Sequence, residues 1–132
     1  MNRFTGFLTV AVLLVSTGAV DAQEAAEAAT YEAQSSAGLV TLEARPEWRD
    51  GSMLVSLSAN THSVDLSTLD LTESVRVLVG GMEYTPVVAG SLSGHHAKAT
   101  LTFDIAVRPD SFKLRIRNVP DVPQRILEWP QT

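Results

Sequence analysis

From Gly38 onward the chain is built of about seven short runs in which apolar and polar side chains alternate, with no helical period among them. The clearest run covers residues 53–60, where apolar side chains recur at every second position: Met53, Val55, Leu57 and Ala59. Successive side chains of a strand point to opposite faces of its sheet, so each run predicts a strand with one buried face. This pattern indicates an all-β fold.

Turn signals separate these runs, and all six prolines lie at or beyond Pro46. Gly80-Gly81 predicts a tight hairpin, because glycine accepts a positive φ at both turn positions. Pro86 cannot donate to a ladder, so the strand it belongs to is an edge strand or ends there. Residues 61–71 fit either a strand pair or an irregular crossover. The predicted strands begin at Leu39, Met53, Val75, Met82, Lys98, Ser111 and Arg125.

These features predict an antiparallel Ig-like β-sandwich of about seven strands. A closed barrel would give similar sequence statistics, but regular turns and short strands favour two sheets around one core. The chain has no cysteine, so no disulfide can join the sheets. Packing must hold the core together, and the predicted aromatic core residues are Trp48, Phe103, Phe112 and Trp129.

Residues 1–22 have the pattern of a secretory signal peptide. A basic start at Arg3 precedes an apolar run over 7–15, and cleavage after Ala22 would leave Gln23 as the first residue. A signal anchor is the alternative, but the apolar run is shorter than the ~20 residues that span hydrocarbon. The mature protein is therefore expected to be exported, periplasmic or extracellular, without a membrane span.

Residues 23–37 are rich in Ala, Glu and Ser and contain a single aromatic residue, Tyr31. Such a composition cannot bury much apolar surface. We interpret the segment as a tether with at most partial helicity; an interaction tail is the alternative. The β-sandwich domain is then expected over residues 38–132.

Composition excludes several classes of function. A net charge of −5 and a pI near 5.0 lack the basic footprint of a nucleic-acid binder. Without cysteine there is no thiol nucleophile, zinc knuckle or iron–sulfur site. His62, Ser63 and Asp65 supply the residue types of a hydrolase triad, but they stand too close along one segment to form its geometry. We do not expect an enzyme.

All three histidines lie in two short polar interruptions: His62 in one, and His95 with His96 in the other. Imidazole is the commonest protein ligand of zinc and copper. Adjacent histidines on a strand point to opposite faces, and both can serve one ion only if the chain bends, which Gly94 permits. We predict a copper or zinc site formed by His62, His95 and His96 with Asp65; Met53 or Met82 could also complete the set.

Structural roles compete with this interpretation. His62 could donate to a neighbouring carbonyl while Thr61, Ser63 and Asp65 organise a turn, and 95–96 could be a polar loop tip. A basic stripe, Lys113, Arg115 and Arg117, alternates with apolar residues. We interpret it as a solvated strand face or as an edge defended by charge, rather than as a binding surface.

Four segments carry a resemblance that spans most of residues 39–129: Thr-His-Ser-Val-Asp-Leu at 61–66, Tyr-Thr-Pro at 84–86, Gly-His-His at 94–96, and residues 118–125 followed by Trp129. The chain resembles a group of small exported bacterial β-domain proteins that have no established activity. The resemblance implies a stand-alone exported β-sandwich-like module and one local site for the three histidines. In that group a basic residue follows the His-His pair directly, whereas here Ala97 precedes Lys98.

The sequence therefore predicts an exported, non-catalytic binding module that holds a metal ion or a small ligand through its histidines. The alternative is a structural or adhesion-type module that docks a protein partner through a strand edge or a loop end.

Overall fold

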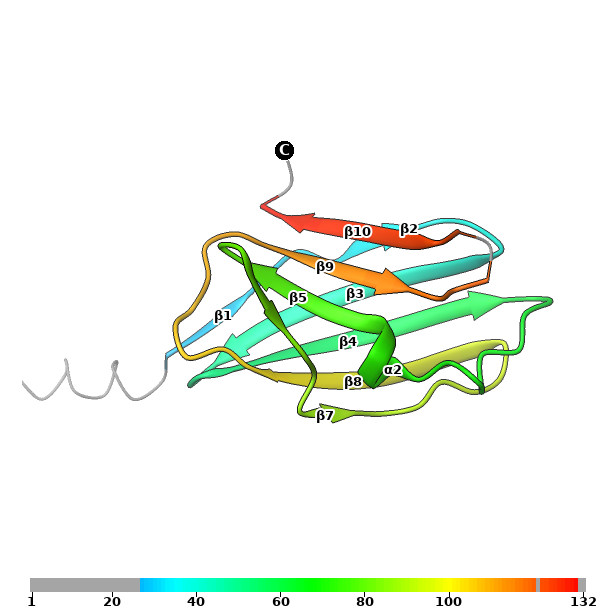
Figure 1. The fold of residues 1–132 in the computed structure, drawn as a ribbon, viewed down its shortest axis with the longest axis horizontal. Coiled ribbons are helices and arrows are strands. Elements are labelled where there is room, and N and C mark those ends of the chain that lie inside the picture. The colour runs from blue at the N-terminus through cyan, green and yellow to red at the C-terminus, as the bar shows by residue number, and fades with distance from the viewer. Residues whose placement is uncertain (1–26, 121, 131–132) are drawn as a thin grey trace, which may run out of the picture.

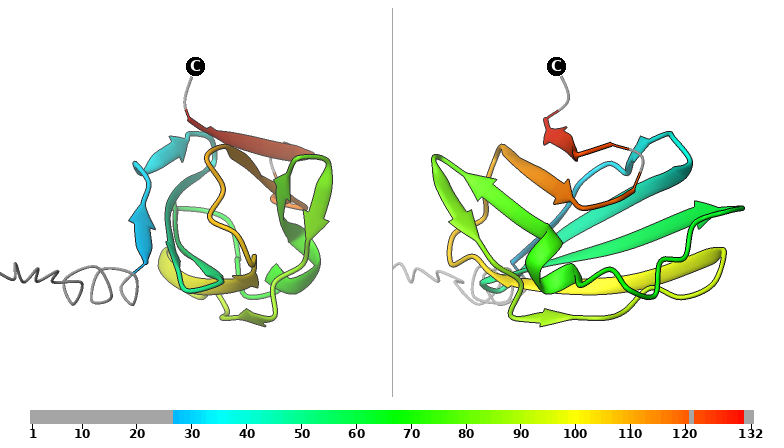
Figure 2. Two further views of the ribbon diagram at one scale, coloured as in Figure 1. Left: turned by 90° about the vertical axis from the view of Figure 1, so that its left-hand side faces the viewer. Right: turned by 45° about the vertical axis from the view of Figure 1, so that its right-hand side comes forward.

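A computed structural model describes residues 27–120 and 122–130. These residues form two antiparallel β-sheets that pack against each other as two layers (Figures 1 and 2). The predicted β-sandwich is confirmed, and the barrel alternative is wrong. The Ig-like detail stays a prediction. The predicted signal peptide, residues 1–22, lies outside the described residues. Within them, no helix has the length and apolar character needed to cross a membrane.

The first sheet, sheet A, has six strands in the order β1-β3-β4-β8-β7, with β2 also paired to β3. Its strands are β1 (Ala28–Thr30), β2 (Gln34–Ser36), β3 (Val40–Arg49), β4 (Ser52–Thr61), β7 (Val88–Ala89) and β8 (His96–Asp104). The long strands β3 and β4 form a hairpin whose turn has a positive φ at Asp50 (46°) and Gly51 (86°). The short strand β7 leaves only two residues paired at the far edge of the sheet.

The second sheet, sheet B, has four strands in the order β10-β9-β5-β6. Its strands are β5 (Val75–Val79), β6 (Met82–Tyr84), β9 (Phe112–Arg117) and β10 (Gln124–Trp129). Gly80 and Gly81 join β5 to β6 with positive φ at both positions, so the predicted hairpin is confirmed. Each of the seven predicted strands begins within two residues of an observed strand.

An irregular crossover carries the chain from β4 in sheet A to β5 in sheet B. It ends in a single helical turn, α2 (Leu71–Ser74), which Asp70 caps by accepting a hydrogen bond from the Thr72 backbone N–H. The side chains of Leu66 and Leu71 are buried against the core. The crossover, and not a strand pair, is therefore the correct interpretation of this segment.

The described part of the predicted tether is instead part of sheet A, which corrects that interpretation. We call residues 28–36 the N-terminal strap; β1 and β2 in it pair with β3. Tyr31 Oη donates to the Pro109 carbonyl over 2.7 Å, Gln34 Nε2 donates to the Glu128 carbonyl, and Trp129 Nε1 donates to the Glu32 carbonyl over 2.7 Å. The strap is stabilised mainly by hydrogen bonds to distant residues, which its composition could not reveal.

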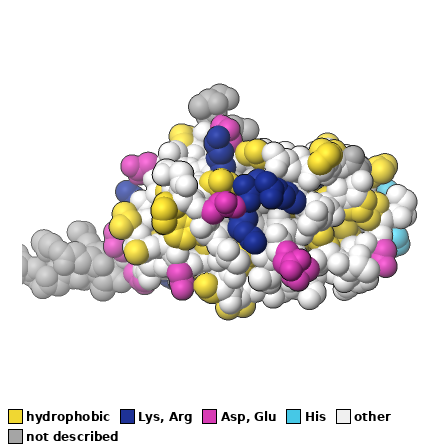
Figure 3. All heavy atoms as spheres, in the orientation of Figure 1, with side chains coloured by type: hydrophobic (Ala, Val, Ile, Leu, Met, Phe, Trp, Pro, Cys, Tyr) yellow, Lys and Arg dark blue, Asp and Glu magenta, His cyan; other side chains and the backbone are white. Residues whose placement is uncertain are grey.

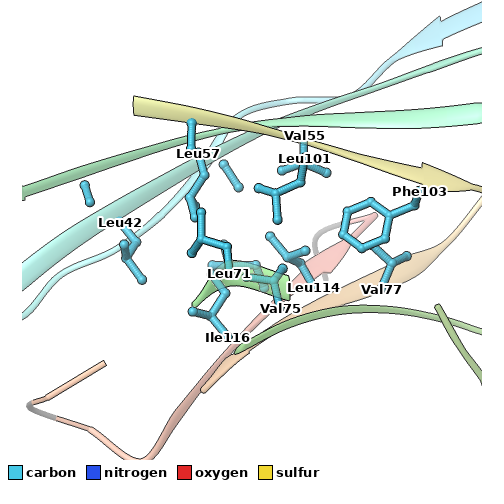
Figure 4. Packing of buried hydrophobic residues seen from close by; sticks show 14 of the residues in the cluster. Leu42, Val55, Leu57, Leu71, Val75, Val77, Leu101, Phe103, Leu114 and Ile116 are labelled. Carbon is cyan, nitrogen blue, oxygen red and sulfur yellow. The ribbon is translucent and has the colours of Figure 1, made fainter. Parts of the chain in front are cut away.

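Side chains from both sheets form one continuous core (Figure 4). Phe103 and Leu101 of sheet A lie opposite residues of sheet B that include Val77 and Leu114. All four predicted aromatic core residues are at most 4% exposed. The ring of Phe112 stacks on Trp129 at 4.9 Å between centroids and meets Tyr31 edge-on at the same separation.

Candidate functional site

The two histidine segments lie side by side at one end of the sandwich, which we call the histidine end (residues 61–65 and 94–96). The first segment leaves β4 and the second enters β8, and these strands are antiparallel neighbours. Asn60 is the register partner of His96, and the Thr61 backbone N–H donates to the His95 carbonyl over 2.9 Å. Figure 3 shows the exposed histidine side chains together at this end.

The side chain of Thr61 forms a turn that places His62 at the surface. Thr61 is buried, and its Oγ1 accepts hydrogen bonds from the backbone N–H groups of Ser63 (3.3 Å) and Val64 (3.2 Å). A threonine hydroxyl that bonds to the backbone in this way turns the chain as it leaves a strand. On the other segment Gly94 has φ +83° and open space around its Cα, which allows the bend before β8.

The imidazole of His62 meets that of His96 edge-on, with 6.5 Å between ring centroids. His96 Nδ1 lies 2.6 Å from Asn60 Oδ1, and His95 Nδ1 lies 3.0 Å from the Thr61 carbonyl oxygen. Since these oxygens can only accept, both Nδ1 atoms carry a proton. In the neutral imidazole the lone pair of His95 and of His96 is then on Nε2.

Asp65 is exposed, and Ser67 orients its carboxylate. Asp65 Oδ1 accepts from the Ser67 hydroxyl (2.6 Å) and from the Ser67 backbone N–H (3.0 Å). These two hydrogen bonds, the hydroxyl's first, hold the pKa of the Asp65 carboxyl below its ordinary value. Asp65, His62 and His95 line a cavity of about 320 Å³, together with Ser63, Val64 and Gly94.

The structure thus brings all four predicted ligand residues to one end of the molecule. The two methionines lie elsewhere: Met53 is buried in the core near the other end of β4, and Met82 lies in β6 of sheet B. Within residues 27–120 and 122–130, no three His, Asp or Glu side chains are already grouped so as to hold a metal ion.

Asn60 is the site residue that sequence reasoning missed. The turn-forming role of Thr61 was among the structural alternatives, and its two hydrogen bonds confirm it. The alternation in 53–60 places Asn60 on the outward face of its strand, but it does not tell which residue lies opposite. That partner follows from the register between β4 and β8, which joins residues 36 positions apart. The available signal was a polar residue at the end of an alternating run, two positions before a histidine.

The fold and the site define a small β-sandwich domain with a histidine-bearing end. Comparison of the chain with protein-family models, with curated proteins and with solved structures found no match.

Proposed function

We propose that the protein is an exported, non-catalytic binding module whose ligand site is the histidine end, and that its ligand is a copper or zinc ion. The observation that supports this most is the His62–His96 pair, in which the Asn60 carboxamide holds Nδ1–H of His96. Metal-binding histidines commonly donate their second ring N–H to such an oxygen, which fixes the ring and its tautomer.

The pair is close to the spacing that a metal requires. With Zn–N bonds of about 2.0–2.1 Å, two imidazole ring centres stand about 5 Å apart in a tetrahedral site. The observed centroids are 6.5 Å apart. Both side chains are exposed, so small side-chain rotations can close this gap. His95 or the ionised Asp65 then supplies a further ligand from the cavity that both line with His62.

A chelator-competition titration of the untagged protein with Cu²⁺ and with Zn²⁺ tests the proposal. We expect saturable uptake, a loss of at least tenfold in affinity in His62→Ala and in His96→Ala, and no uptake in the triple variant that also carries His95→Ala. Lys98→Ala is the matched control, since Lys98 is exposed on the same strand as His96.

Two results would overturn the metal proposal: no uptake of either ion by the unmodified protein, or a triple variant that titrates like it. Either result would leave the protein-interaction module as the better hypothesis.

A further inference from the structure

The outer face of sheet B carries a patch of basic side chains. Lys113, Arg115 and Arg117 lie on β9, and the register between β5 and β9 adds Arg76 directly opposite Arg115. Figure 3 shows Lys and Arg side chains in contact with one another on the face that carries β5 and β9. We call Arg76, Arg115 and Arg117 the arginine cluster.

The charges of the cluster do not protect a sheet edge. β9 lies between β10 and β5, and β5 lies between β9 and β6. Both strands are therefore interior strands, although β5 pairs with β6 only over residues 77–79. The interpretation of the basic stripe as an edge defended by charge is wrong, whereas the interpretation as a solvated strand face stays a prediction.

The cluster also carries an electrostatic cost. Side chains directly opposite on antiparallel strands have Cβ atoms about 4.5–5.5 Å apart, and like charges there are destabilising. Arg76 and Arg115 are such a pair. Arg117 stands two positions along β9 from Arg115, about 7 Å away on the same face. An anion between these three side chains would remove the repulsion.

The side chain of Arg115 is only 14% exposed. Its Nη2 forms an ion pair with Glu83, which is itself half-exposed. Its Nε is buried and has no hydrogen-bond partner among the described residues. A single carboxylate therefore satisfies this guanidinium only in part.

The other two members are held by neutral groups. Arg76 Nη1 donates to the carbonyls of Thr72 (2.6 Å) and Val75 (2.8 Å), and Arg117 Nε donates to the Gln124 side-chain oxygen at 3.4 Å. Lys113, on the same face, forms an ion pair with Glu128 at 3.6 Å. In the part of the chain that the structure describes, the three guanidinium groups of the cluster thus form an ion pair with one carboxylate, that of Glu83.

We infer that the arginine cluster is a binding site for a phosphate group, either free phosphate or a phosphate ester. A guanidinium presents parallel N–H donors that match two oxygens of a phosphate, and it keeps its charge at any physiological pH. Arg76 and Arg117 would contact the phosphate oxygens. Arg115 is largely buried, and its positive charge would add to the attraction. Glu83 competes with the ligand for Arg115.

Titrations of the full chain with inorganic phosphate and with glycerol phosphate, at constant ionic strength, test the inference. Binding is followed by calorimetry and by the NMR signals of the arginine Nε–H groups. We expect saturable binding with shifts at the three cluster arginines. Tighter binding of inorganic phosphate would identify the free ion as the ligand, and equal or tighter binding of the ester would identify a phosphate ester.

Paired variants make the test specific. The double variant Arg76→Gln/Arg117→Gln should weaken binding at least tenfold. The control Arg45→Gln/Arg49→Gln removes the same charge from sheet A, where each arginine pairs with a glutamate two residues away, and should change affinity less than twofold. Glu83→Gln should strengthen binding, an effect that misfolding cannot produce.

The inference is overturned if neither phosphate compound gives saturable shifts at the cluster, if the two double variants weaken binding equally, or if Glu83→Gln weakens it.

Discussion

His96 is oriented by a residue that has no metal chemistry of its own. Asn60 Oδ1 accepts a hydrogen bond from Nδ1–H of His96 and so leaves the lone pair on Nε2. Under the proposed function, Asn60 is a positioning residue whose contribution is separable from that of the ligands themselves.

We therefore expect Asn60→Ala to weaken copper or zinc affinity about 10- to 100-fold without abolishing binding, the usual effect of losing a partner of a metal-bound histidine. The same chelator-competition titration measures it. Ser58→Ala is the control, because Ser58 lies on the same face of β4, two residues earlier. Full affinity in Asn60→Ala would show that the hydrogen bond has no part in binding.

The ionisation of the Tyr31 hydroxyl tests whether this side chain of the strap is packed as described. Burial raises the pKa of Tyr31 above 10.0; the charge of Arg108 opposes the shift and that of Asp110 adds to it. When the pKa of a group is higher in the folded state than in the unfolded state, its contribution to stability is complete at pH values below the unfolded-state pKa. That contribution is lost as the pH rises through the folded-state pKa. The free energy of unfolding should thus decrease as the pH rises above about 10.

The variant Tyr84→Phe leaves Tyr31 as the only tyrosine, because the chain has two. In this variant the ultraviolet absorbance of the phenolate should appear at a higher pH in the native protein than in urea. A native midpoint equal to or below the midpoint in urea would contradict the buried position of this side chain.

Among the elements, the N-terminal strap joins the two sheets. Besides Tyr31, Gln34 and Glu32, it offers the carbonyl of Ser36, which accepts a hydrogen bond of 3.0 Å from the buried Arg125 of β10. At about 1 kcal/mol for each of these four side-chain hydrogen bonds, the strap should contribute about 4 kcal/mol to the stability of the fold.

Two truncations test this contribution. Removal of residues 1–27 leaves the strap in place and should change the free energy of unfolding little, whereas removal of residues 1–37 should lower it by about 4 kcal/mol or prevent folding. Urea denaturation measures both. In the full chain, Gln34→Ala should lower the free energy of unfolding by about 1 kcal/mol. Equal stability of the two truncated proteins would restore the interpretation of this segment as a tether.

The strap also shows what alternation in a sequence can and cannot reveal. Strands such as β4 were predictable because every second side chain is buried, a pattern contained within one segment. The strap and β7 were not, because their partners are remote and they bury few apolar side chains. At the histidine end, the presence of three histidines in two short segments suggested a cluster. The position of Asn60 opposite His96, like that of Arg76 opposite Arg115 on sheet B, depends on a strand register that no single run contains.

At the scale of the whole molecule, stability depends on one core shared by two sheets, without a disulfide. Phe103 has no exposed surface and lies between the two sheets, beside Val77 (Figure 4). Phe103→Ala should lower the free energy of unfolding by about 3–5 kcal/mol, since it removes apolar contacts and leaves a cavity.

Because domains are typically stable by about 5–15 kcal/mol, this loss is a large part of the total. Urea denaturation compares Phe103→Ala with Val107→Ala, whose side chain is 77% exposed and whose change should stay within about 0.5 kcal/mol. A loss below about 1 kcal/mol in Phe103→Ala would mean that the sheets do not share a tightly packed core.

The strap has a consequence for the order of events in folding. Its bonds to Glu128, Trp129 and Arg125 join residues 89–97 positions apart, so the beginning of the domain is secured by its last strand. A chain that emerges from the ribosome with its N-terminus first therefore cannot complete these strap contacts until β10 has emerged as well.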